Sequence, residues 1–247
     1  MTGVALVMPM AGRGSRFAEH GVATPKPLVS LWGRPFFWWA AESARRAFDV
    51  VEMVCVVLSD HVRDFAITDR IAEFYPDARF VVIPEVTGGA AETAKLGVEQ
   101  LRHQGPLIVN DTDHAFRTLH GAALGSRLTN GTGGALLTFR SDSPAYSYAR
   151  LDAAGEVTGT VEKQVASPNA IAGGYLFASP ADYLSAYADY CADCPYDEAF
   201  VSGLYDRLIG RGRRVAVDLL DDHISFGTPE ELRRLGERPT QPWAEWL

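Results

Sequence analysis

The sequence predicts an α/β protein with a doubly wound mixed sheet and a β-rich C-terminal elaboration. Strand-like runs of β-branched residues alternate with helical stretches as far as about residue 130. From Gly133 onward the strand signals lie closer together. The chain has 247 residues and 47% hydrophobic content, which suffices for one substantial core or two small ones. These three observations exclude a disordered, fibrous or disulfide-scaffold protein.

In the first half, alternation of strands and helices implies right-handed crossovers and a parallel sheet that is covered on both faces. The apolar run at residues 4–10 is the first buried strand, and the aromatic start of the next helix, Phe36 to Trp39, is typical of a core or a dimer face. We expect strands at residues 4–10, 53–58, 80–84 and 106–110, and helices at 36–47, 62–74 and 90–101.

In the second half we expect four closely spaced strands, with a hairpin turn at residues 152–155. A short terminal helix begins at Thr228, because Thr is a good N-cap and Pro229 suits the first helical position. Trp243 and Trp246 predict a tail that docks on the body or on a partner subunit. The expected strands are 135–140, 146–151, 157–162, 173–177 and 214–219, and the helices are 180–191 and 198–209.

Charge and cysteine content narrow the function classes. The chain has 23 basic and 31 acidic residues, a net charge of −8, which argues against a nucleic-acid binder. Three cysteines are too few to staple a secreted fold, so we expect a cytoplasmic protein, and Cys191 and Cys194 lack the further ligands of a zinc site. The apolar start, broken by Gly12 and Gly14, predicts neither a secretion signal nor a membrane span.

The first strand leads into a loop suited to phosphate. Glycines at positions 12 and 14 let backbone N–H groups approach an anion, while Arg13, Arg16 and Lys26 supply three positive charges. A polyphosphate is the natural ligand. The segment lacks the Gly-Lys-Ser/Thr of a P-loop and the third glycine of a dinucleotide fingerprint. A tight turn with a solvated basic loop is the alternative.

Five motifs together resemble those of the sugar-phosphate nucleotidyltransferases, also called nucleotide-sugar pyrophosphorylases. They are Gly12 to Phe17 with the Pro-Lys-Pro-Leu run at 25–28, Asn-Asp-Thr-Asp at 110–113, Glu-Lys at 162–163, Ala-Gly-Gly-Tyr at 172–175 and Gly-Thr-Pro-Glu-Glu-Leu at 227–232. The resemblance spans nearly the whole chain. It implies one Rossmann-like domain over residues 1–247, of the nucleotide-diphospho-sugar transferase type, with a nucleotide-binding half at 1–130 and an acceptor-binding half at 131–247.

The resemblance also implies the reaction. The family joins a nucleoside triphosphate to a phosphorylated small-molecule acceptor, releases pyrophosphate and requires magnesium. Attack of a phosphate oxygen on the α-phosphorus chiefly needs charge neutralisation and in-line positioning. By the motif match Arg16 lies along the triphosphate and Lys26 holds the α-phosphate or the attacking phosphate. The loop residues Ala11, Gly12, Arg13, Gly14 and Ser15 are the other expected nucleotide contacts.

Asp113 is the expected magnesium ligand, because it follows a parallel strand and matches the position of the family's metal aspartate. For Asp111 we expect a turn-capping role. A second metal aspartate in many relatives stands where this chain has Ser225, so either Asp222 substitutes for it or Asp113 acts alone.

The segment after residue 84 is expected to contact the base. Gly89 lets the backbone approach a planar ring, and Glu85 stands where several uridine- or thymidine-using relatives have glutamine. An ionised glutamate only accepts hydrogen bonds, so it favours the amino groups of guanine or cytosine, and hence GTP or CTP. The alternative is that Glu85 merely pairs with a nearby cation.

Glu162, Lys163 and Gly173 match the family's acceptor-binding residues: the carboxylate takes sugar hydroxyls, the ammonium meets the acceptor phosphate, and the glycine leaves room for the ring. Ser147 departs from the pattern, since hexose-using relatives often have glycine there. The acceptor is therefore open between a sugar 1-phosphate and a related phosphate.

Three functions stay open. The leading one is a magnesium-dependent sugar-phosphate nucleotidyltransferase. The others are a cytidylyltransferase that acts on a non-sugar phosphate or phosphonate, and a catalytically silent homologue that binds nucleotide. We expect no nucleic-acid or membrane partner, and homo-oligomerisation is compatible with the sequence.

Overall fold

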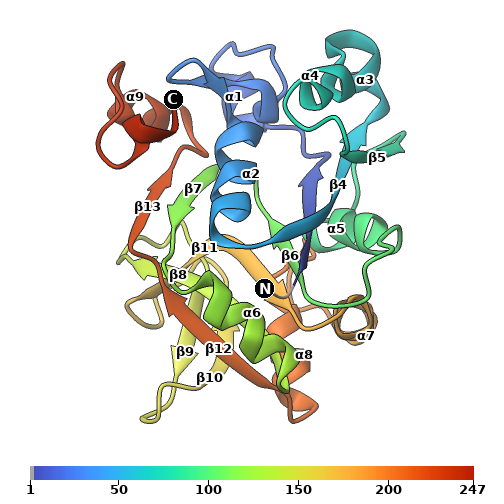
Figure 1. Cartoon of the computed structure of the whole chain (residues 1–247), viewed down its shortest axis with the longest axis vertical. Helices are drawn as coiled ribbons and strands as arrows, with labels where there is room; N and C mark the ends of the chain where they lie inside the picture. Colours follow the sequence, from blue (N-terminus) through green and yellow to red (C-terminus); the bar gives the residue numbers. More distant parts are fainter. Residues whose placement is uncertain (1–2) are drawn as a thin grey trace.

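A computed structural model describes residues 3–247, and its centre is a nine-stranded mixed sheet (Figure 1). The strands run in the order β10 (Val157–Val161), β9 (Tyr148–Leu151), β11 (Asn169–Phe177), β6 (Leu107–Asn110), β1 (Val4–Met10), β4 (Val50–Leu58) and β5 (Arg79–Ile83). The remaining two strands extend from β11, with β8 (Thr132–Arg140) pairing β11 and β12 (Arg214–Leu219) pairing β8.

The strand directions differ between the two parts of the sheet. β1 lies parallel to β4 and β6, and β4 lies parallel to β5, as the alternation of strands and helices predicts. β11 is antiparallel to β6, β8 and β9, so the second half adds antiparallel strands to a parallel core. Two small ribbons complete the strands: β2 (Ser30–Leu31) with β3 (Arg34–Pro35), and β7 (His114–Arg117) with β13 (Asp222–Ser225).

Helices cover both faces of the sheet. On one face α2 (Phe36–Ala47), α4 (Ile67–Ala72) and α6 (Gly121–Thr129) share one apolar core with the C-terminal tail. On the other face α5 (Ala90–Val98), α7 (Pro180–Ala192) and α8 (Leu204–Gly210) form a second core. The short helices α1 (Ser15–Glu19) and α9 (Pro229–Leu235) lie at the same end of the molecule, while α3 (Ser59–Phe65) packs on β4 and β5 (Figure 1).

The aromatic start of α2 belongs to the core. Phe36, Phe37 and Trp39 are fully buried, so they do not form a dimer face. Trp246, in a 3₁₀ turn at Trp243–Trp246, stacks on Trp39 with ring centroids 6.1 Å apart. The tail therefore docks on the body of the same chain.

Most predicted elements are present, and the exceptions have local causes. The helix expected at 62–74 is two helices, because Ala66 adopts a left-handed conformation with φ of 49°. The helix expected at 198–209 begins only at Leu204, since the preceding segment crosses the pocket described below. β7, α6 and β13 had no clear sequence signal. The terminal helix begins as expected, with a capping box between Thr228 and Glu231.

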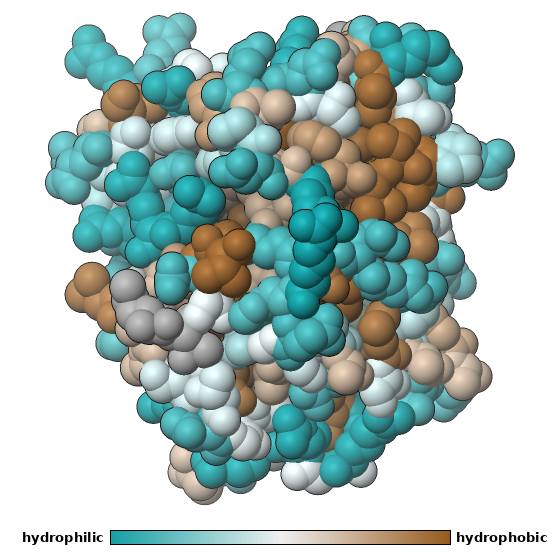
Figure 2. Space-filling view, turned by 45° about the vertical axis from the view of Figure 1, so that its right-hand side comes forward, coloured by the Kyte–Doolittle hydropathy of each residue, from teal (hydrophilic) through white to brown (hydrophobic). Residues whose placement is uncertain are grey.

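Within residues 3–247 no helix combines the length and hydrophobicity needed to cross a bilayer. The face seen in Figure 2 is largely hydrophilic, with a hydrophobic area at its upper right. Val82 on the edge strand β5 is 50% exposed. Homo-oligomerisation stays a prediction.

Candidate active site

A pocket of about 420 Å³ opens at the carboxyl ends of β1 and β6 and collects residues from both halves of the chain. Open α/β sheets bind their ligands at such an edge. Of the predicted site residues, ten line it: Gly12, Gly14, Ser15, Arg16, Lys26, Asp113, Ser147, Glu162, Lys163 and Gly173.

The phosphate loop, residues 11–16, follows β1 and is largely exposed. Gly14 has φ of +59°, and a Cβ there would lie 3.0 Å from the Lys26 Cβ. Glycine thus permits both the turn and the approach of Lys26. Arg16 is exposed and lines the pocket, whereas Arg13 and the buried Ala11 do not.

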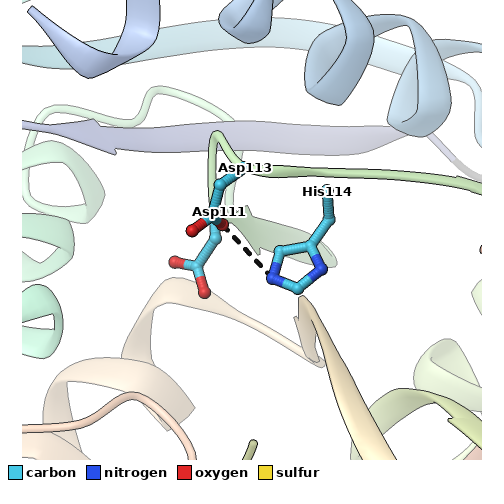
Figure 3. Close-up of side chains that lie close together, drawn as sticks. All are labelled: Asp111, Asp113 and His114. Carbon is cyan, nitrogen blue, oxygen red and sulfur yellow. Dashed lines mark ion pairs between the residues drawn. The ribbon is translucent and has the colours of Figure 1, made fainter. Parts of the chain in front are cut away.

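The carboxylate loop, residues 111–114, connects β6 to β7 and faces the phosphate loop. Lys26 Nζ donates to Asp113 Oδ2 at 2.5 Å, and His114 Nε2 lies 3.2 Å from Asp113 Oδ1. Asp111 projects beside them (Figure 3). One ligand atom from each of these acidic and histidine side chains lies within 4.8 Å of the others. Two carboxylates are the oxygen donors that magnesium prefers, so this donor set fits a divalent cation.

The two carboxyl groups have opposite pKa shifts. Burial, and then the charge of Asp113, raises the pKa of Asp111 to about 8. Burial would raise the pKa of Asp113 too, but the adjacent Lys26 and His114 hold it below its ordinary value. Asp113 is thus the ionised member of the pair, while Asp111 retains a proton until a cation or base takes its place.

Two histidines in contact with each other hold the Asp113 carboxylate in place. His114 Nδ1 lies 2.8 Å from His223 Nε2, and the His223 ring stacks on Phe139 with centroids 3.8 Å apart. Burial lowers the pKa of both histidines, and His114 lowers that of His223 further. With both rings neutral, His223 donates to His114 and His114 donates from Nε2 to Asp113, a tautomer assigned from the contacts. The pair fixes the orientation of the carboxylate.

Two glycines let the backbone close around the carboxylates. A Cβ on Gly227 would lie 2.5 Å from Asp113 Oδ2. A Cβ on Gly173, where φ is +71°, would lie 2.7 Å from His114 Cδ2. The motif glycines are therefore required by the carboxylate loop itself.

The expected acceptor pair is held from one side. Ser202 Oγ donates to Glu162 Oε1, and the Tyr196 hydroxyl accepts from the Glu162 amide at 3.4 Å. The Lys163 ammonium lies over the Phe200 ring, 4.9 Å from its centroid. No described residue donates a hydrogen bond to the second carboxylate oxygen of Glu162, Oε2.

The structure does not bring Asp222 to Asp113. In the β7–β13 ribbon Ser225 lies opposite His114, while Asp222 lies opposite Arg117, with 3.7 Å between Asp222 Oδ2 and Arg117 Nη1. Three residues along a strand span about 10 Å, so Asp222 is too distant to share a metal with Asp113. Asp111 occupies the neighbouring position instead.

Glu85 and Gly89 do not line the pocket. Glu85 is exposed after β5. Gly89 packs on residue 199, since a Cβ there would lie 2.5 Å from the Ala199 nitrogen. The close packing against Ala199 explains why a glycine is needed at position 89. The role of Glu85 and Gly89 in recognising the base stays a prediction.

Sequence reasoning missed one residue of the pocket, Asp111, and two that hold pocket residues in place, His223 and Ser202. No described residue donates a hydrogen bond to the Asp111 carboxylate, so it caps no turn. The sequence did contain a signal for Asp111 as a site residue. In the Asn-Asp-Thr-Asp-His run, Asp111 and Asp113 are two residues apart, and alternate side chains point to the same side of the loop. His223 and Ser202 had no local signal, because they reach the site through pairings across 109 and 40 residues.

Many solved structures resemble this fold, and two of them cover nearly the whole chain. One is a nucleoside-diphosphate-sugar pyrophosphorylase from Vibrio cholerae RC9, with 24% identity over 94% of this chain and 100% of that chain, and a TM-score of 0.83. The other is a protein of Bacillus anthracis assigned as a glucose-1-phosphate thymidylyltransferase, in complex with sucrose, with 16% identity over 96% of both chains and a TM-score of 0.75. The chain has the nucleotide-diphospho-sugar transferase fold.

This confirms the predicted fold class. No family model matches the chain, and no curated protein matches it by sequence. In this chain the phosphate loop is the turn after β1, and the carboxylate loop is the turn after β6.

Proposed function

We propose that the protein is a magnesium-dependent nucleotidyltransferase that joins a nucleoside triphosphate to a sugar 1-phosphate or a related phosphate and releases pyrophosphate. One observation carries the proposal: the Lys26–Asp113 pair, with Asp111 and Arg16, lines one pocket between the two halves of the chain. Paired cations and carboxylates at one point suit a polyphosphate with its metal. The likeness to the solved structures of a nucleoside-diphosphate-sugar pyrophosphorylase and of a protein assigned as a glucose-1-phosphate thymidylyltransferase supports it.

In this proposal an acceptor phosphate oxygen attacks the α-phosphorus, and the bond to the pyrophosphate oxygen breaks. Lys26 uses one of its three donors on Asp113 and has two left for phosphate oxygens. Arg16 neutralises charge that develops on the leaving pyrophosphate. No protein nucleophile is needed.

Asp113 and Asp111 would hold magnesium, with His114 keeping Asp113 in place. The bound ion would neutralise phosphate charge and orient the triphosphate. Glu162, fixed through one oxygen by Ser202, presents its other oxygen to an acceptor hydroxyl. Lys163 supplies a charge for the acceptor phosphate.

For the base we retain GTP or CTP, on the chemistry of Glu85. A cytoplasmic location fits, because all three cysteines are free. Ser147, in place of the glycine of hexose-using relatives, lines the pocket together with Gly173. This supports screening acceptors beyond hexose phosphates, including the phosphates and phosphonates of a cytidylyltransferase.

The test is a thermal-shift panel of GTP, CTP, ATP, UTP and dTTP, each with and without magnesium. A nucleotide at a hundredfold excess over its Kd stabilises the fold by about 2.7 kcal/mol. We expect the largest magnesium-dependent shift with GTP or CTP, followed by pyrophosphate release when a phosphorylated acceptor is added. Binding without turnover on any acceptor would favour the silent homologue, and no shift with any nucleotide would refute the nucleotide site.

A further inference from the structure

One segment of the chain contacts both the start of α5, in the nucleotide-binding half, and the expected acceptor residues. This strap, residues 194–203, connects α7 to α8. On the nucleotide side the Ala199 amide donates to the Gly88 carbonyl at 2.9 Å, and the Ala91 amide donates to the Ala199 carbonyl at 2.8 Å. The strap therefore pairs its backbone with the start of α5.

On the acceptor side the strap holds the Glu-Lys pair. Ser202 donates to the Glu162 carboxylate and is only 1% exposed, and Phe200 lies under the Lys163 ammonium. Lys163 itself has φ of +50°, a conformation that a non-glycine residue adopts only where neighbours hold it. The position of this pair thus depends on the strap.

The first residue of the strap is a cysteine that closes its turn. Cys194 Sγ lies 3.3 Å from the Tyr196 carbonyl oxygen and 3.7 Å from the Glu198 carbonyl oxygen, so its single thiol proton is shared between them. A sulfur without a proton could not make these contacts.

A second thiol lies three residues earlier. Cys191 is in the last turn of α7 and is exposed, whereas Cys194 is half-buried and Cys55 is fully buried in β4. The Asp193 amide donates to the Tyr190 carbonyl at 3.2 Å, so α7 ends in a turn over residues 190–193 that contains Cys191. Only two residues separate Cys191 from Cys194, which is the spacing of the Cys-X-X-Cys pairs that form disulfides.

We propose that Cys191 and Cys194 form a reversible disulfide that releases the strap from the start of α5 and from the Glu162–Lys163 pair. The oxidant is a small-molecule disulfide such as oxidised glutathione. The two protein thiols are oxidised to one Sγ–Sγ bond, the glutathione disulfide is reduced to two thiols, and the two protons pass to those thiols. Exposed thiols beside a resolving cysteine are typical of redox-sensing pairs in reducing compartments.

The consequence for turnover rests on the proposed function: release of Glu162 and Lys163 would weaken binding of the acceptor and leave the Lys26–Asp113 contact in place. A cell would then lower activity under oxidation without losing the folded protein.

The test needs no substrate, so its failure is distinguishable from failure of the proposed function. The whole protein is equilibrated in glutathione buffers of graded potential, and intact and peptide masses report the disulfide. We expect an internal 191–194 bond with Cys55 unmodified. Hydrogen exchange of peptides covering residues 195–203 and 88–91 is then expected to rise about threefold to tenfold on oxidation, the factor for loss of one hydrogen bond.

Three variants sharpen the test. Cys194→Ser keeps a donor and Cys191→Ser keeps the Cys194 thiol, so both are expected to retain slow exchange in oxidising buffer. Cys194→Ala, in reducing buffer, is expected to exchange as fast as the oxidised protein. Mixed disulfides with glutathione in place of the internal bond, or an internal bond with unchanged exchange, would overturn the proposal.

Discussion

The two loops that face each other across the pocket are built in opposite ways. In the phosphate loop, Arg13 and Arg16 are exposed, and no described residue forms an ion pair with either. In the carboxylate loop, Asp113 is held by Lys26, His114 and the close approach of Gly227. The difference teaches that the charge on one side of the site is held by protein contacts before any ligand binds, whereas the arginine charges on the other side have no partner among the described residues. A charge already held by the protein costs no reorganisation during reaction, but an unpartnered side chain loses entropy when a ligand immobilises it.

The largest effect is expected at the preorganised loop. Asp113→Asn removes the charge held by Lys26 and His114 and should lower kcat about 10²–10³-fold, because a fixed electrostatic group of this kind typically contributes that much. Pyrophosphate release at saturating magnesium measures it. Asp222→Asn is the matched control at an aspartate on the adjoining ribbon, and normal turnover of Asp113→Asn would show that the carboxylate loop is not the reacting side.

The open loop gives the next effect. Arg16→Ala is expected to reduce kcat/KM about 10–100-fold through loss of charge-assisted hydrogen bonds, with Tm unchanged because the side chain is exposed. Arg13→Ala is the matched control, since Arg13 is exposed but does not line the pocket. Equal losses in the two variants would mean that the loop acts through its general positive charge and not through a specific contact of Arg16.

A smaller effect tests whether the carboxylate loop is rigid. Gly227→Ala would place a Cβ 2.5 Å from Asp113 Oδ2. If the loop cannot yield, the free energy of unfolding should fall by about 1–3 kcal/mol and the magnesium-dependent thermal shift should shrink. Gly210→Ala, where nothing lies within 4 Å of the added carbon, is the control. A variant with wild-type Tm and metal response would show that the loop is pliable.

The smallest effect on activity is expected at the opposite end of the sheet. Glu52 pairs with Arg79 at 2.6 Å and accepts from the backbone amides of Arg102 and His103. Burial raises its pKa, but these donors lower it more, so the net value lies below the ordinary one. Glu52→Gln should leave kcat/KM unchanged.

The same variant has a pH signature. Because the folded pKa is depressed, ionised Glu52 stabilises the fold above its unfolded pKa, and this contribution is lost as the pH falls through the folded pKa. Glu52→Gln should therefore cost about 1–3 kcal/mol at pH 7. The difference from wild type should shrink once the pH falls below the unfolded pKa of about 4.3 and disappear below the lower folded pKa. Urea unfolding at pH 7 and over a series of acid pH values checks this, and a cost independent of pH would assign the effect to packing.

The contrast between the loops also explains what the sequence could reveal. Glycines, arginines and Lys26 of the phosphate side lie close together in the chain, so their motif could be read directly. The carboxylate side depends on contacts between residues that are far apart in the sequence. His114 contacts His223, and the residue opposite His114 in the ribbon is Ser225 rather than Asp222. The order of strands decides these contacts, and β7 and β13 carry no strong strand signal. Asp222 was therefore a reasonable candidate for a metal ligand from its place in the sequence, but the register of the ribbon places it far from Asp113.

The backbone contact between the Phe226 amide and the Asp113 carbonyl, at 2.9 Å, has a consequence for synthesis. About 110 residues must be added to the chain after Asp113 before that amide exists. At a synthesis rate of about 5–20 residues per second, the delay is roughly 6–22 s. During that interval the nascent chain contains its phosphate loop and its carboxylates but lacks the segment that encloses them. The site can therefore be completed only after the segment around Phe226 has been synthesised.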